Sequence, residues 1–190
     1  MPPETAVVRP AGARAADLLS AELPDAVISR EVAHGEETVL VRAGHLEPVA
    51  LLLRDHPDAL YRLPLFVTAV DYPDREPEVP RFDIVYQLRS LMFNDVCRVV
   101  VRVPEDAPVV ASLEHVFAGM DWHERECYDL FGITFTGHSN LRRILLPDDW
   151  EGHPLRKDYV SFGEPVAFTH NIEWALPAQE RPPGMPGSTG

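Results

Sequence analysis

The stretch that decides the fold is residues 81–103, which read RFDIVYQLRSLMFNDVCRVVVRV. Two runs within it alternate between apolar and mostly polar side chains. In the first run, one face carries Phe82, Ile84, Tyr86 and Leu88, and the other carries Arg81, Asp83, Val85 and Gln87. In the second run, Cys97, Val99, Val101 and Val103 lie opposite Arg98, Val100 and Arg102. This period of two is typical of antiparallel strands with one buried face, and the short link at residues 90–95 predicts a hairpin.

The segments before this hairpin add helices and further strands. An Ala- and Leu-rich helix is expected over residues 11–23, ended by Pro24, and a second helix over residues 45–54. Short strands are expected at residues 26–31, 38–42 and 65–70. The pattern therefore predicts an α+β fold, a mostly antiparallel sheet packed with helices.

A third helix is expected to begin at Asp121, where Asp-x-x-Glu with Glu124 resembles a capping box. Gly132 is a natural end for this helix, and residues 133–135 can form a brief strand. Beyond that point Gly, Pro, Asn and Asp recur, and regular structure is expected to be sparse. We therefore predict a globular domain over residues 1–135 and an extended, irregular C-terminal arm and tail over residues 136–190.

Composition limits the classes of function. The formal net charge is −13, which argues against nucleic acid as a partner, because phosphate binding requires a basic surface. The longest aliphatic run is Val49–Leu53, much shorter than the roughly 20 residues that a membrane span needs. The two cysteines, Cys97 and Cys127, form no CxxC pair, and a reducing cytoplasmic compartment is expected.

Residues 121–159 hold the chemistry-bearing side chains at their highest density, and they suggest two kinds of catalytic site. His123, Cys127, His138 and His153 are possible metal ligands, but His138 and His153 stand alone in loops instead of forming a short ligand pair. The carboxylates Glu124, Glu126 and Asp129 crowd one helix and suggest acid–base work. His123 and Cys127 share a helical face that can instead help to bury the helix, and acids near a helix N-terminus are favoured by the helix dipole, so both sites are weaker hypotheses than a structural role.

A local basic cluster lies in the same stretch of this acidic chain. It consists of Arg142, Arg143, Arg156 and Lys157, the single lysine of the sequence. One interpretation is a solvated loop with internal ion pairs, each of which contributes little at a surface. The other is an interface strip, since arginine and aromatic side chains are enriched in protein–protein contacts. An irregular backbone needs another surface to order it, which favours the interface.

At these residues the chain resembles the family of the 30 kDa subunit of respiratory complex I, the NADH-quinone oxidoreductase. The first motif is Glu124-Arg125-Glu126-x-x-Asp129-Leu130-Phe131, followed by His138, Arg142 and Ile144-Leu145. The second is Gly152-His153-Pro154-Leu155-Arg156-Lys157-Asp158-Tyr159, and residues 69–73 and 81–86 are similar to the strand block of the family. One departure is Ser139, where the family commonly has proline after Gly-His.

The resemblance implies a non-catalytic scaffold and assembly subunit in the peripheral arm of a proton-pumping NADH-quinone oxidoreductase. Its neighbour in the family is the 49 kDa quinone-site subunit, with further peripheral-arm subunits nearby. No cofactor is expected on this chain, while FMN, iron–sulfur clusters and quinone are expected on other subunits. The expected location is the cytoplasmic side of the cell membrane, reached only through the complex. The alternative is the equivalent subunit of a membrane-bound energy-converting hydrogenase or another quinone-reducing dehydrogenase; a stand-alone metal-dependent enzyme is a weaker one.

The resemblance also selects the residues expected to form the signature and the partner interface. They are Glu124, Arg125, Glu126, Asp129, Gly132, His138, Arg142, Arg143, Gly152, His153, Arg156, Lys157 and Asp158. We expect Arg125, Glu126 and Asp129 to fix the helix and the start of the arm. The later residues are expected to hold the arm, either internally or against the partner.

Overall fold

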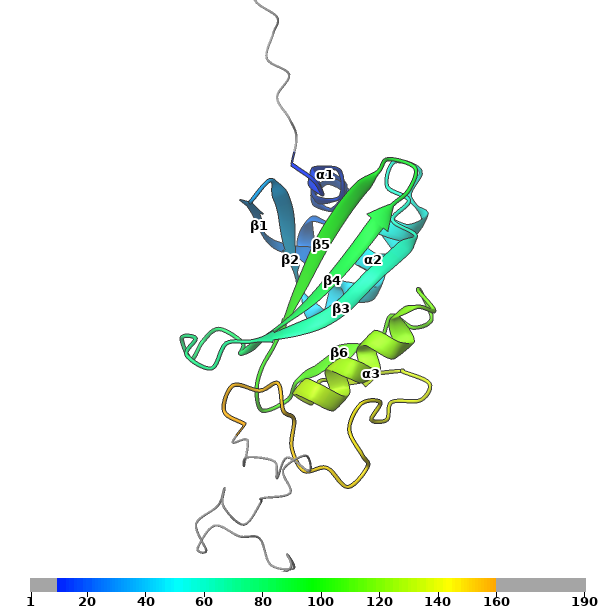
Figure 1. The fold of residues 1–190 in the computed structure, drawn as a ribbon. Coiled ribbons are helices and arrows are strands. Elements are labelled where there is room, and N and C mark those ends of the chain that lie inside the picture. Colours follow the sequence, from blue (N-terminus) through cyan, green and yellow to red (C-terminus); the bar gives the residue numbers. More distant parts are fainter. Residues whose placement is uncertain (1–9, 160–190) are drawn as a thin grey trace, which may run out of the picture. The chain divides into compact units, whose positions relative to one another are not determined.

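The computed structural model describes residues 10–159 (Figure 1). In chain order its helices and strands are α1 (Ala13–Glu22), β1 (Val27–Ala33), β2 (Glu36–Val41), α2 (Leu46–Asp55), β3 (Leu63–Asp71), β4 (Phe82–Ser90), β5 (Asp95–Val103), β6 (Val109–Ala111), α3 (Met120–Phe131) and β7 (Thr134–Thr136). Short 3₁₀ turns precede β1 and α2. The three helices and the hairpin predicted from the sequence are all confirmed, with boundaries that differ by a few residues.

The main sheet has five strands in the order β1-β2-β5-β4-β3. Strands β3 and β4, β4 and β5, and β1 and β2 pair antiparallel, so the mostly antiparallel α+β fold is confirmed. The pairing of β2 with β5 is parallel and was not predicted. It arises because α2, β3 and β4 intervene between these two strands, so the chain returns to the middle of the sheet over a long connection.

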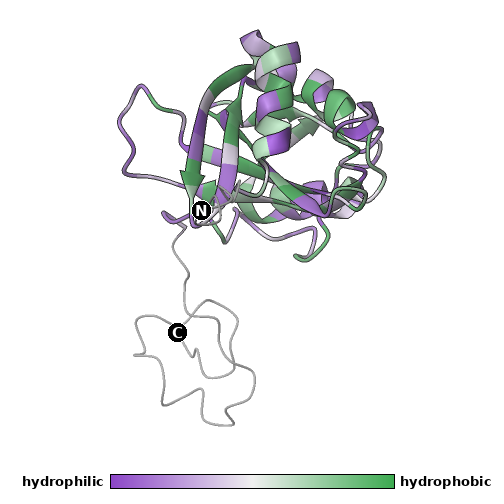
Figure 2. Ribbon diagram, turned by 90° about the horizontal axis from the view of Figure 1, so that it is seen from above, coloured by the Kyte–Doolittle hydropathy of each residue, from purple (hydrophilic) through white to green (hydrophobic). Residues whose placement is uncertain are grey.

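The alternation in β4 separates a buried face from a more open one. Ile84 and Tyr86 are almost fully buried, and they belong to a core that also contains Leu19 of α1, Leu53 of α2 and Phe131 of α3. Figure 2 shows the helices gathered beside the sheet, with hydrophobic segments in both layers. The apolar faces of the helices and of the sheet therefore pack together in one core.

The start of α3 differs from the expectation. The helix begins at Met120 with Gly119 as its N-cap, and no side chain caps it, so the predicted capping box of Asp121 and Glu124 is wrong. The physical reason is that the Glu124 side chain is fully buried and accepts hydrogen bonds from the Ser112 hydroxyl and the Leu113 N–H. A carboxylate held there cannot reach back to the first turn.

Two short strands form a separate sheet next to α3. The expected strand at residues 133–135 is confirmed as β7, and its parallel partner β6 was missed because three residues carry too little pattern. After β7, residues 137–159 contain no helix or strand and run beside α3 (yellow and orange in Figure 1). The division at residue 135 stays a prediction, and residues 160–190 of the predicted arm lie outside the described residues.

Candidate functional site

Helix α3 carries an unusual set of buried polar side chains. Glu124 and Asp129 are fully buried and Arg125 is 7% exposed, although all three are ionisable. Buried charges are costly unless ion pairs and hydrogen bonds satisfy them. The hydrogen-bond partners of Arg125 and Asp129 come from the arm, so these two residues couple the helix to the irregular segment that follows it.

The Asp129 carboxylate organises the middle of the arm. Its Oδ2 accepts the N–H groups of Ile144, Leu145 and Leu146 at 3.0, 2.7 and 2.9 Å, and its Oδ1 accepts Arg143 Nη1 at 2.7 Å. Burial acts to raise the pKa of Asp129, but these N–H groups and the Arg143 guanidinium outweigh it and leave the pKa lowered. The carboxylate is therefore held in its charged form, which is the form that satisfies three consecutive backbone donors.

Arg125 fixes the residues immediately before this turn. Its Nε donates to the carbonyl of Arg142 at 3.2 Å and its Nη2 to the carbonyl of Arg143 at 3.1 Å. The guanidinium also lies 5.2 Å from the ring centre of Trp122, within the range of a cation–π contact. The spacing of Arg125 and Asp129 on the helix suggests that they pair with each other, but both side chains turn to the arm.

The C-terminal end of α3 is closed by the second half of the arm. The carbonyl of Asp129 lies 2.9 Å from His153 Nδ1, the Leu130 carbonyl accepts the Leu155 N–H, and the Phe131 carbonyl accepts Arg156 Nε at 2.7 Å. These are carbonyls that a helix end leaves without partners, and a cation at this position is favoured by the helix dipole. Since a carbonyl only accepts, the His153 Nδ1 carries the proton.

Gly132 is the point at which this packing is tightest. Its φ of +74° is the left-handed conformation that glycine adopts readily at a helix end, as predicted. A Cβ there would lie 2.6 Å from His153 Cδ2 and 2.7 Å from Arg156 Nη2. Any side chain at this position would push the arm away from α3.

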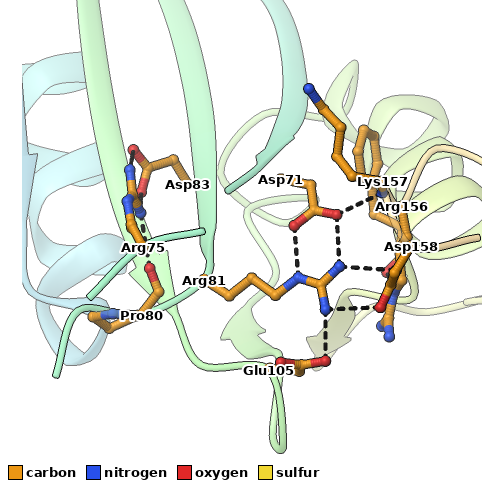
Figure 3. A network of polar contacts seen from close by, with 10 residues as sticks. Asp71, Arg75, Pro80, Arg81, Asp83, Glu105, Arg156, Lys157 and Asp158 are labelled. Carbon is orange, nitrogen blue, oxygen red and sulfur yellow. Dashed lines mark hydrogen bonds and ion pairs between the residues drawn. The ribbon is translucent and has the colours of Figure 1, made fainter. Parts of the chain in front are cut away.

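A second buried network fixes the end of the described arm (Figure 3). Arg81 binds the fully buried carboxylate of Asp71 through two hydrogen bonds of 2.7 and 2.8 Å, and it also pairs with Glu105 and Asp158. Asp71 also accepts a hydrogen bond from the Lys157 N–H, at 2.8 Å. Burial acts to raise the pKa of Asp71, but Arg81 and this N–H together lower it.

Asp71 and Arg81 were not predicted to contact the arm. They lie at the end of β3 and just before β4, and the sequence marks them only as part of the strand block. Their signal is their presence in the two upstream segments that resemble the family. Charged residues at strand ends are common, so that signal does not indicate a contact with a segment more than 70 residues away.

The beginning of the arm is fixed by His138. Its imidazole is fully buried, with Nδ1 accepting the Asn140 N–H at 3.0 Å and Nε2 lying 3.3 Å from the carbonyl of Asp121. Next to it, Ser139 donates through both its N–H and its hydroxyl to Glu114, and these bonds lower the pKa of that carboxyl. Ser139 therefore makes hydrogen bonds that the proline common in the family would lack.

The predicted site residues fall into two groups. Nine contribute side-chain contacts, or close packing at Gly132, within the chain: Glu124, Arg125, Asp129, Gly132, His138, Arg143, His153, Arg156 and Asp158. Glu126 is exposed, and Arg142, Gly152 and Lys157, which are also exposed, contribute backbone groups to such contacts. A role of any of these residues in contacting a partner stays a prediction.

The residues considered for a metal site are not brought together. His138 and His153 make the separate backbone contacts described above, and Cys127 is buried in the core, where burial raises the pKa of its thiol. Within residues 10–159, no group of three His, Cys, Asp or Glu side chains has the geometry to hold a metal ion. The stand-alone metal enzyme therefore has no assembled ligand set in this part of the chain.

The carboxylates considered for acid–base chemistry are likewise divided. Burial raises the pKa of Glu124, against the bonds from Ser112 and Leu113, whereas the pKa of Asp129 is lowered and Glu126 is exposed. Glu124 and Asp129 use their oxygens to bind different segments of the same chain. Their arrangement serves to join segments of backbone.

Comparison with known proteins gives the same assignment as the motifs. A family model described as respiratory-chain NADH dehydrogenase, 30 Kd subunit, matches residues 39–165. A relative from Roseiflexus castenholzii, itself an NADH-quinone oxidoreductase subunit, is 46% identical over 153 residues, which are 80% of this chain and 86% of that relative. The chain belongs to the 30 kDa subunit family. It is a subunit of an NADH-quinone oxidoreductase of the respiratory chain.

Solved structures support the fold of this 30 kDa family member. A trypsin-resistant fragment (1-134) of Nqo5 is 27% identical, with a TM-score of 0.50, over 60% of this chain and 89% of the fragment. A chain of the membrane-bound sulfane sulfur reductase, an archaeal respiratory membrane complex, matches over 77% of this chain and 84% of its own length. Its TM-score is 0.62, and at 22% identity it shows a shared fold only. Within residues 10–159, no helix is long and apolar enough to cross a membrane.

The Asp129 carboxylate predicts a large effect on stability. Asp129→Asn keeps the shape of the side chain but removes the charge that binds Arg143 and three N–H groups. We expect the free energy of unfolding to fall by about 3 kcal/mol, as when one member of a buried pair is removed. Urea unfolding of the purified chain measures it. The control Glu126→Gln, on the same helix but exposed, should change stability by less than about 0.5 kcal/mol. Equal effects of the two variants would contradict this role.

The lowered pKa of Asp129 also predicts a pH dependence. A carboxyl whose pKa is lower when folded stabilises fully above its unfolded pKa, about 3.9, and the contribution is lost as the pH falls through the folded value. The difference in unfolding free energy between wild type and Asp129→Asn should therefore be constant from about pH 7 to 5 and shrink below about pH 4. His153 has its pKa lowered mainly by burial; the charge of Asp129 is the last of the causes that act on this pKa, so the contribution of His153 largely cancels in the difference. A difference that is unchanged down to about pH 3 would refute the prediction.

Proposed function

We propose that this chain is a scaffold and assembly subunit that docks on the quinone-site subunit of the complex, on the cytoplasmic side. In this proposal electrons pass through FMN, iron–sulfur clusters and quinone on other subunits. This chain contributes a surface that binds the quinone-site subunit. No residue of the chain takes part in the chemical steps of the reaction.

The observation that supports the proposal is that side chains of the signature bind the backbone of their own chain. Arg125, Asp129 and Arg143 bind backbone groups of an irregular segment, and Gly132 leaves room for it. Side chains of an active site would instead converge on a space that a substrate can enter. A long segment without helix or strand, fixed in one conformation at the surface, is suited to recognition by another protein.

The single lysine allows a direct test of the partner. Lys157 is exposed and lies in the arm, and it is the one side-chain amine of this sequence to which an amine-reactive cross-linker can attach. In the intact complex, purified in mild detergent, we expect Lys157 to be linked to the quinone-site subunit. Mass spectrometry of the digested complex identifies the link.

The control is Lys157→Arg, which keeps the positive charge but removes the reactive amine. It should abolish the link and leave the composition of the complex unchanged. Links from Lys157 to other subunits alone would contradict the proposed partner. A Lys157 that stays unlinked in the complex, yet reacts there with a small amine-acetylating reagent as fully as in the isolated chain, would contradict docking through the arm.

A further inference from the structure

In the described part of the chain, almost all lysine and arginine side chains contact other groups of the same chain. Of the 17 lysine and arginine residues, all but Arg9 and Arg181 lie in the described part. Within residues 10–159 each of them makes a hydrogen bond, ion pair or ring contact through its side chain, with two exceptions. The exceptions are Arg142 and Lys157, both in the arm and both exposed.

These two residues are nevertheless fixed through their backbones. The carbonyl of Arg142 accepts a hydrogen bond from Arg125, and the N–H of Lys157 donates to the buried Asp71 carboxylate. Figure 3 shows the Lys157 side chain extending away from that carboxylate. These contacts thus fix the backbone of Arg142 and of Lys157, and they leave both charged groups free of contacts within the described residues.

Two leucines of the arm are held in the same way. The N–H of Leu145 binds the Asp129 carboxylate and the N–H of Leu155 binds the Leu130 carbonyl, yet the residues are 63% and 50% exposed. An exposed leucine alone needs no explanation. Here the backbone of each is ordered by buried charge or by a helix end, which lowers the entropy that a binding partner must remove.

We propose that Arg142, Leu145, Leu155 and Lys157 are the docking residues of the arm, and that their occupant is a surface of another subunit bearing carboxylates around apolar side chains. The proposal deepens the proposed function and rests on it. Charge complementarity supports this occupant. A chain of net charge −13 repels acidic surfaces elsewhere, and the two free cations of its described part lie where the arm presents them. If two copies of this chain docked through this surface, cations of one copy would face the same cations of the other.

The test is a charge reversal in the complete complex. Arg142→Glu/Lys157→Glu replaces the wild-type chain, a tag on this chain retrieves the complex from membranes, and mass spectrometry quantifies the other subunits. We expect recovery of those subunits to fall about tenfold or more, since each interfacial charge that is left opposed costs at least about one factor of ten. The charge-conserving Arg142→Lys/Lys157→Arg should assemble like wild type.

A matched control separates local contact from net charge. Arg42→Glu/Arg62→Glu changes the net charge by the same amount. Both arginines are exposed, and the side chain of each donates one hydrogen bond to a backbone carbonyl. This variant should assemble normally. Amide exchange of residues 144–146 in the Arg142→Glu/Lys157→Glu chain should match wild type, because the reversed side chains make no contact within residues 10–159.

The inference would be overturned by normal assembly of the reversed chain, by equal loss in the matched control, or by lost protection of residues 144–146. Loss of a homodimer with the other subunits retained would also overturn it, since it would make a second copy the occupant. If the charge-reversed chain assembles normally while Lys157 of the wild type is cross-linked to the quinone-site subunit, these four residues are not the docking surface, but the proposed function stands. A cross-link to a different subunit, with loss of assembly on reversal, would refute the proposed partner and support the surface.

Discussion

The buried carboxylate of Asp129 is the interaction on which the ordered arm depends. A segment without helix or strand must still satisfy its backbone donors and acceptors. One charged group on α3 satisfies three consecutive N–H groups and pairs with Arg143, which in turn binds the carbonyls of Trp150 and Gly152. The two halves of the arm are thereby joined through one side chain. The polar residues of α3 are therefore best understood as replacing the hydrogen bonds that regular secondary structure would have supplied.

Much of the sheet could be predicted because its pattern is local. Alternation in β4 and β5 marked the buried face, and their short link marked the hairpin. The parallel pairing of β2 with β5 could not be predicted in this way, because no local signal specifies a partner strand across the length of α2, β3 and β4. The capping box failed for a related reason, since Glu124 has partners before α3 that the helix sequence does not reveal.

The candidate site could be located from the sequence but not interpreted in full. Arg142 and Arg143 are adjacent and chemically identical, yet only Arg143 binds Asp129, and the Arg142 side chain is exposed. The same contrast holds for Arg156 and Lys157, of which only Arg156 contacts α3. The motifs and the basic cluster located the candidate site in residues 121–159. Which residues face inward depends on the path of an irregular backbone, and no period of two or 3.6 describes that path. In the described residues, the arm is ordered by α3 and, at its end, by Asp71 and Arg81 of the same chain.

The contacts within residues 10–159 are sufficient to order the arm before any partner binds. Hydrogen exchange of the Ile144, Leu145 and Leu146 amides, measured on the isolated chain at neutral pH, shows whether this order is present. We expect slow exchange at all three amides, because each is donated to the buried Asp129 carboxylate. Exchange at the rate of an unfolded peptide in the isolated chain, with protection only in the assembled complex, would contradict it.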